Sequence, residues 1–128
     1  MSLRRILIVD DDPDIRRITA LSLARIGGFS VVAAASAEEA LAKAAEELPD
    51  VILLDVSMPG ADGPTTLATL RATARTARVP VIFFTAEADD ERAAQLCALG
   101  AMGVITKPFD LAGLPGRIRD MLSGSGLE

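Results

Sequence analysis

The chain has 128 residues, half of them hydrophobic, which is enough for a single domain with one hydrophobic core. Its formal net charge is −5 and no stripe of basic residues is present, which argues against direct binding to nucleic acid or to an anionic membrane surface. The chain has no histidine and only one cysteine, Cys97. Internal disulfides, cysteine-cage metal sites and catalysis by a histidine of this chain are therefore excluded.

No apolar run is long enough to cross a bilayer and no signal-peptide pattern is present, so a cytoplasmic protein is expected. Residues 1–3 and 123–128 are expected to be terminal segments without a structural role. The sequence therefore predicts one domain over residues 1–128, with a core of about residues 4–122.

The first predicted pair of elements is a strand over residues 6–9 and a helix that begins at Asp12-Pro13. Aspartate is a favoured N-cap and proline is favoured at the first helical position, so Asp12 is interpreted as a capping residue. The helix is expected to end at Gly27-Gly28. Its predicted apolar face consists of Ile15, Ile18 and Ile26, with Leu21 or Leu23 between them.

The next stretch predicts a strand, a helix and a second strand that is buried on both faces. Residues 29–34 form the strand, and Ser36 followed by Glu39 is a capping box for a helix that runs to Leu48. The apolar run over residues 51–54 is too short for a helix and is typical of a central parallel strand. It ends in Asp55, a charge that is tolerated at the mouth of a strand but costly inside the core.

The second half of the chain continues the same alternation. Helices are predicted from Pro64 to about Arg75, after the acidic residues between 87 and 91 as far as Gly100, and from Asp110 to about Leu122. Pro115, with Gly113 and Gly116 on either side of it, disfavours the first turn of the last helix. Strands are predicted over residues 81–84, ending in Thr85, and over 104–105, followed by Thr106, Lys107 and Pro108.

Five strands alternating with five helices predict a parallel sheet with right-handed crossovers and helices on both faces. The expected architecture is the flavodoxin-like (βα)5 three-layer sandwich with strand order 2-1-3-4-5. Ligands of such sheets bind at the carboxyl ends of the strands, at the switch point between strands one and three. This order places Asp10 and Asp11 beside Asp55.

Four of the five strands end in a polar residue suited to cation or phosphate chemistry. Three packed carboxylates, from Asp10, Asp11 and Asp55, repel one another and stay ionised together only with a cation between them. Hard oxygen ligands favour Mg²⁺, with Mn²⁺ as the alternative ion. The ammonium of Lys107 and the hydroxyl of Thr85 can contact phosphoryl oxygens, which leaves Asp55 as a nucleophile that forms an acyl phosphate.

These residues resemble the receiver domain of two-component response regulators. The resemblance covers nearly the whole chain, in the segments ILIVDDD, LLDVSMPGADG, FFTA and ITKPF. It implies that Asp55 accepts a phosphoryl group from a histidine on a sensor kinase or a phosphotransfer protein, that Thr85 and Lys107 bind its oxygens, and that the module then switches contacts with a downstream protein. It also implies a magnesium site formed by Asp10, Asp11, Asp55 and the backbone carbonyl of Ser57.

Two departures from the family pattern lead to further predictions. Many receivers have an aromatic residue three places before the strand-five lysine, but this chain has Val104, so the signal is expected to travel through the loop after Thr85 and the start of the fourth helix. The segment before the fifth strand, which includes Met102, lacks the acidic residues of receivers that form salt-bridged dimers. A monomer or a weak dimer is therefore expected.

Two other functions fit the predicted fold. An aspartate-dependent phosphatase of small molecules usually has a second acid two positions after its nucleophile, but Ser57 occupies that position. The acidic loop after the first strand argues against a flavin-binding protein, because without a metal ion it would repel the phosphate of a flavin nucleotide. The favoured interpretation is a signalling module that catalyses only its own phosphoryl transfer and the slow hydrolysis of its own phosphoryl group. It would act either as a stand-alone protein or as part of a longer one.

Overall fold

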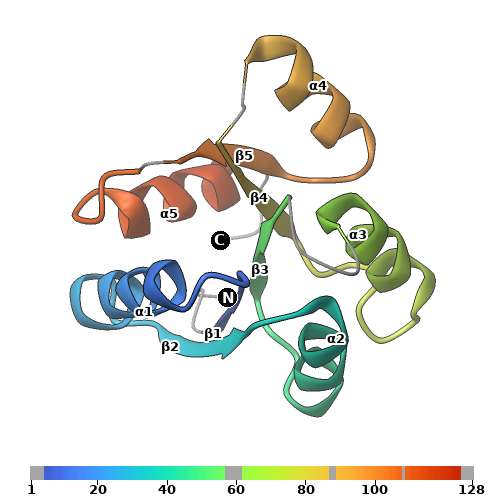
Figure 1. Ribbon diagram of the computed structural model, residues 1–128, viewed down its shortest axis with the longest axis horizontal. Helices are drawn as coiled ribbons and strands as arrows, with labels where there is room; N and C mark the ends of the chain where they lie inside the picture. Colours follow the sequence, from blue (N-terminus) through green and yellow to red (C-terminus); the bar gives the residue numbers. More distant parts are fainter. Residues whose placement is uncertain (1–4, 57–61, 87–88, 108, 125–128) are drawn as a thin grey trace.

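Five parallel strands form one sheet in the order β2-β1-β3-β4-β5, which confirms the predicted topology (Figure 1). The computed structural model describes residues 5–56, 62–86, 89–107 and 109–124. The strands are β1 (Arg5–Val9), β2 (Ser30–Ala34), β3 (Val51–Asp55), β4 (Val81–Thr85) and β5 (Gly103–Thr106). The helices are α1 (Pro13–Leu21), η1 (Ser22–Ile26), α2 (Ala37–Glu46), α3 (Gly63–Ala72), α4 (Asp90–Ala98) and α5 (Leu114–Gly124).

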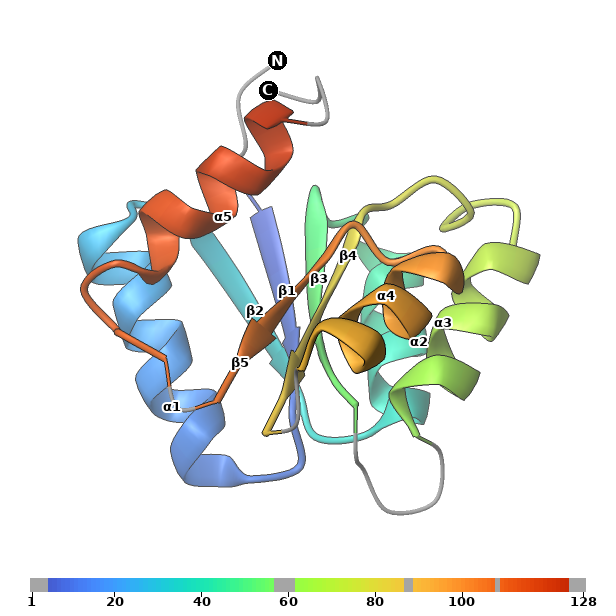
Figure 2. The ribbon, with the colours of Figure 1, turned by 90° about the horizontal axis from the view of Figure 1, so that it is seen from above.

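Helices cover both faces of the sheet, with α1 and α5 on one side and α2, α3 and α4 on the other (Figure 2). Successive side chains of a strand point to opposite faces, so each strand contributes to two cores. On β1, Ile6 and Ile8 belong to the cluster with Ile118 of α5, whereas Leu7 and Val9 belong to the cluster with Leu67 of α3. Within the described residues, no helix has the length and apolarity to span a membrane.

The first predicted helix differs from the expectation in shape and in its buried face. It is an α-helix only to Leu21 and continues as a π-helix, η1, to Ile26. Ile18 and Ile26 are exposed, at 39% and 58%, so the prediction that they face the core is wrong. The buried positions are instead Thr19, Ser22 and Leu23. Ser22 fits there because its hydroxyl donates to the carbonyl of Leu111.

The last helix begins later than predicted, at Leu114 instead of Asp110. A helix that started at Asp110 would require the N–H of residue 115 to bond the Leu111 carbonyl, and proline has no N–H. The hydroxyl of Ser22 satisfies that carbonyl instead. Pro115 therefore lies in the first turn, where proline is tolerated.

Two other helices end earlier than predicted, α2 at Glu46 instead of Leu48 and α3 at Ala72 instead of about Arg75. At the end of α3, hydroxyl groups compete with the backbone for the last carbonyls. The Thr76 hydroxyl donates to the Leu70 carbonyl at 2.7 Å and the Thr73 hydroxyl to the Thr69 carbonyl at 2.8 Å. Side chains of this kind offer the chain an alternative to a further helical turn.

The predicted N-caps are confirmed. The side chain of Asp12 accepts from the amides of Asp14 and Ile15, and the Ser36 hydroxyl accepts from the Glu39 amide. These caps fix the direction in which α1 and α2 leave the carboxyl end of the sheet. The predicted acidic residue Glu87 lies outside the described residues.

Candidate functional site

Three of the predicted site residues continue the side-chain row that faces α1 and α5. Asp10 follows Ile6 and Ile8 along that row, and Asp55 follows Val51 and Leu53. Lys107 stands two residues after Ile105, which belongs to the same cluster. Alternation along parallel strands therefore delivers two carboxylates and one ammonium to the same side of the same sheet edge.

The ammonium of Lys107 lies between the two buried carboxylates. Its Nζ is 2.8 Å from Oδ2 of Asp10 and 3.4 Å from Oδ1 of Asp55. The side chains of Asp10 and Asp55 are only 1% and 9% exposed, whereas that of Lys107 is 21% exposed. Since buried carboxylates are costly without a partner, this amine compensates the charge of both acids.

The third carboxylate, Asp11, completes an acidic cluster that opens to solvent. One carboxylate oxygen from each of Asp10, Asp11 and Asp55 can be chosen so that all three lie within 4.8 Å of one another. Asp11 is exposed while the other two are buried, so an ion has access from solvent. Three hard oxygen donors with room for water match the preference of Mg²⁺, which usually keeps several waters in protein sites.

The position of Lys107 is set by contacts on both sides of it. Its backbone amide donates to the carbonyl of Thr85 at 2.8 Å, which ties it to the end of β4. Two residues later, the ring of Phe109 stacks on Phe84, with centroids 4.9 Å apart. Burial lowers the pKa of the Lys107 amine, but the hydrogen bond to Asp10 and the charges of Asp10 and Asp55 outweigh burial, so this pKa lies above its usual value of 10.5.

The structure places Thr85 at the end of β4, beside Thr106 of β5. Thr85 is buried, at 7% exposure. Alternation along β4 assigns its side chain to the same row as Phe83, which faces α2, α3 and α4, rather than to the row of Asp55. The predicted role of its hydroxyl stays a prediction. Ser57, whose carbonyl is a predicted metal ligand, lies outside the described residues.

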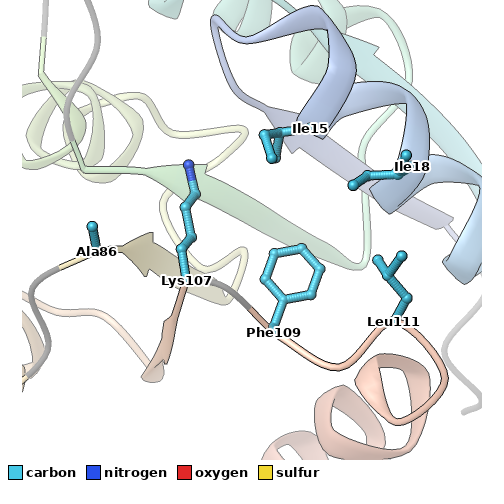
Figure 3. A pocket seen from close by; sticks show the side chains of 6 residues that line it. All are labelled: Ile15, Ile18, Ala86, Lys107, Phe109 and Leu111. Carbon is cyan, nitrogen blue, oxygen red and sulfur yellow. The ribbon is translucent and has the colours of Figure 1, made fainter.

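Beside Lys107 lies an apolar hollow between α1 and the segment that leads from β5 to α5 (Figure 3). Its volume is about 310 Å³, and its lining consists of Ile15, Ile18, Ala86, Lys107, Phe109 and Leu111. Figure 3 shows the two isoleucines on one side and Phe109 and Leu111 on the other, with the lysine amine at one end. The charged cluster therefore adjoins an open apolar surface.

A comparison with models of protein families finds one that matches most of this chain. The model described as the response regulator receiver domain matches residues 6–119. This chain belongs to the response regulator receiver family. The receiver fold accounts for the parallel sheet, and the matched range includes every predicted site residue.

Two curated relatives of this receiver are named as transcriptional regulators. It is 41% identical over 123 residues to the transcriptional regulatory protein PrrA of Mycobacterium tuberculosis, covering 95% of this chain and 51% of PrrA. It is 37% identical over 118 residues to the DNA-binding dual master transcriptional regulator RpaA of Synechocystis, covering 92% of this chain and 48% of RpaA. The receiver therefore spans about half the length of these relatives.

Among solved structures, the receiver resembles the chemotaxis response regulator CheY4 of Vibrio cholerae. The TM-score is 0.86 at 32% sequence identity, and the match covers 94% of this chain and all of CheY4. A receiver domain protein from Methanospirillum hungatei matches with a TM-score of 0.82 at 32% identity, over 98% of both chains. These matches agree with the predicted flavodoxin-like fold.

Sequence reasoning missed one side chain that contacts the receiver's acidic cluster. The guanidinium of Arg16, on α1, donates from Nη1 to the backbone carbonyl of Asp10 at 2.8 Å. Arg16 and Arg17 are adjacent, and only their placement on the helix distinguishes them. A helical projection from the N-cap at Asp12 would have placed Arg16 near the strand end, but only the coordinates show which group it contacts.

Proposed function

We propose that this receiver accepts a phosphoryl group on Asp55 from a phosphorylated histidine of a sensor kinase or phosphotransfer protein in the cytoplasm. The observation that carries the proposal is the convergence of Asp55 with two further carboxylates and the Lys107 ammonium at the carboxyl edge of the sheet. Edges of this kind bind ligands in open α/β folds. The absence of histidine from the chain agrees with a donor nitrogen on another protein.

Asp10, Asp11 and Asp55 are the side chains that would hold Mg²⁺, or Mn²⁺ in its place. They fit such an ion because they supply hard oxygen donors, two of them buried and one exposed. The bound ion supplies positive charge where a phosphoryl group meets three carboxylates.

The chain's own groups account for the transfer step. A carboxylate oxygen of Asp55 forms the new bond to phosphorus, while the bond from phosphorus to the donor's imidazole nitrogen breaks and that nitrogen keeps the electron pair. Lys107, already 3.4 Å from Asp55, is placed to compensate the charge of the product. Thr85 is proposed to donate its hydroxyl to a phosphoryl oxygen.

The apolar hollow beside Lys107 supports a protein as the donor. Its lining is apolar apart from the lysine, and it adjoins the acidic cluster. Apolar side chains of a partner protein can fill such a hollow while its histidine approaches Asp55. The phosphorylated receiver is proposed to lose its phosphoryl group by slow hydrolysis and to act through a downstream protein, as a monomer or a weak dimer.

Intact-mass analysis after incubation with acetyl phosphate tests this proposal directly. With Mg²⁺, the wild-type protein should gain the mass of one phosphoryl group, and the gain should vanish with excess chelator or in Asp55→Asn. Asp12→Asn is the matched control, because it removes a neighbouring carboxylate but keeps an N-cap residue, and it should be phosphorylated normally. Phosphorylation of Asp55→Asn would contradict the assignment.

The alternative of a small-molecule phosphatase is not favoured by the family match. It predicts sustained turnover of a generic phosphate ester such as p-nitrophenyl phosphate. The receiver proposal predicts no such turnover by the wild-type protein beyond that of Asp55→Asn.

A further inference from the structure

The side chain of Arg16, on α1, contacts the backbone of Asp10, which is one of the three acids of the cluster. Its Nη1 is 2.8 Å from the carbonyl oxygen of Asp10, and its backbone amide donates to the carbonyl of Asp12 at 3.0 Å. The residue is half-buried. Its side chain and its main chain therefore hold the turn between β1 and α1 at two points.

Asp10 is held at each of its polar groups. Its amide donates to the carbonyl of Ala34 at 3.1 Å. One carboxylate oxygen accepts from the amide of Asp12 at 2.9 Å and the other from Lys107 at 2.8 Å. The Arg16 guanidinium binds the remaining group, the carbonyl, and Asp10 is buried. The direction of this carboxylate therefore depends on a network to which Arg16 belongs.

We propose that Arg16 is a positioning residue for the cation site. By fixing the carbonyl of Asp10, it orients the peptide that follows and thereby keeps the carboxylate of Asp11 turned toward those of Asp10 and Asp55. The inference rests on the proposed magnesium site and adds to it a residue that touches neither the ion nor the phosphoryl group. Partners that orient metal ligands commonly contribute about 10- to 100-fold in metal affinity.

The charge of Arg16 and its positioning role predict opposite changes in Mg²⁺ affinity when Arg16 is replaced by a neutral residue. A guanidinium beside an acidic cluster repels a divalent cation, so electrostatics alone predicts tighter Mg²⁺ binding when Arg16 is neutralised. The charge of Arg16 also reaches Glu39 on α2. A hydrogen bond from Lys43 is the main cause that lowers the pKa of the Glu39 carboxyl, and the positive charge of Arg16 adds to it. A positioning role predicts weaker Mg²⁺ binding, because the ligands lose their alignment. The direction of the change therefore separates the two roles.

The test compares Mg²⁺ dissociation constants of purified variants by titration calorimetry without phosphate. Arg16→Ala should bind Mg²⁺ about tenfold more weakly than wild type. Arg17→Ala is the matched control, because it removes the same charge from the next, exposed position of α1, and its affinity should be unchanged or slightly higher. Arg16→Lys, which keeps a donor and the charge, should recover part of the loss.

A second measurement shows whether the variant acts by alignment or by unfolding. Hydrogen exchange at the amide of Asp12, which donates to Asp10, should be faster in Arg16→Ala without Mg²⁺, while exchange in β3 and β4 stays slow. Arg16→Ala that binds Mg²⁺ as tightly as wild type, or more tightly, would overturn this inference and leave the proposed function standing. Wild-type protein that binds no Mg²⁺ would overturn both.

Discussion

Lys107 supplies the positive charge that faces both buried carboxylates of the site. Its ammonium contacts two carboxylates that are almost wholly buried, and its amide is fixed to the carbonyl of Thr85. Before any cation or phosphoryl group binds, this amine is what makes the burial of Asp10 tolerable. The same residue therefore contributes to stability and, in the proposed function, to phosphoryl binding.

Lys107→Met should lower the free energy of unfolding by about 2 kcal/mol at neutral pH without Mg²⁺, because a buried carboxylate loses a charged partner. The folded-state pKa of Lys107 is raised, so its contribution is complete below the unfolded-state value near 10.5 and is lost as the pH rises through the folded-state value. The difference between wild type and variant in urea denaturation should therefore shrink above about pH 10.5.

Lys43→Met is the control for the loss of one lysine charge. Lys43 pairs with Glu39 on the surface of α2, at 3.1 Å and with both side chains more than a third exposed, and its ammonium also donates to the Ala33 carbonyl. Exposed pairs of this kind contribute at most about 1 kcal/mol. If both substitutions lowered the free energy of unfolding equally, the role given to Lys107 would be contradicted. The same holds if the loss of unfolding free energy in Lys107→Met did not change with pH.

At the scale of elements, the start of α3 packs directly against the strand that carries Asp55. The amide of Gly63 donates to the carbonyl of Val56 at 2.8 Å. A Cβ at Gly63 would lie 2.6 Å from the Asp55 carbonyl and 2.8 Å from the ring of Phe83. Glycine is therefore required here by a close approach between helix and strand.

Gly63→Ala should destabilise the protein by about 1–3 kcal/mol and slow the phosphorylation of Asp55, because the end of β3 must shift. Gly116→Ala is the matched control, since a Cβ there meets nothing within 4 Å and alanine favours the helix. Thermal unfolding and phosphorylation rates with acetyl phosphate measure both effects. A Gly63→Ala protein as stable and as reactive as wild type would show that this contact does not matter.

The elements also show what the sequence can and cannot predict. The apolar runs of the five strands and the caps at Asp12 and Ser36 are local signals, so the topology and most helix starts follow from them. The Leu111 carbonyl bonds Ser22, which is 89 residues away, and no local pattern reveals that contact. The late start of α5 and the contact of Arg16 with Asp10 likewise depend on tertiary packing, which overrides local preference.

The site itself follows largely from topology. Once β1, β3 and β5 are known to be parallel, their carboxyl ends share one edge, and Asp10 meets Lys107 although 97 residues separate them. The side chain of Thr85 is less predictable, because ending at the same edge does not ensure the same face of the sheet.

At the scale of the molecule, the surroundings of Val104 bear on how a phosphoryl group on Asp55 would be read out. This residue is partly buried against the cluster on the α2, α3 and α4 face, which includes Leu96 of α4, and it pairs with Phe83 in the sheet. A β-branched side chain in such a position has few alternative rotamers. Val104 is therefore poorly suited to act as a rotating switch.

Activation should instead move the end of β4 and the first turn of α4. Methyl and amide NMR spectra of the free and beryllofluoride-bound protein should show the larger changes at Thr85 and at residues 90–92, with the Val104 methyl groups little affected. Helix α5, on the opposite face of the sheet, provides internal reference signals (Figure 2). Large shifts confined to Val104, with a static start of α4, would contradict this route.

The most direct test of the whole account is a crystal structure obtained with Mn²⁺ and beryllofluoride, read through the anomalous scattering of manganese. We expect one manganese peak bounded by the carboxylates of Asp10, Asp11 and Asp55, with the beryllofluoride attached to Asp55 and the Lys107 amine facing it. A structure in which the three carboxylates point apart, manganese binds elsewhere and Lys107 extends into solvent would contradict the account.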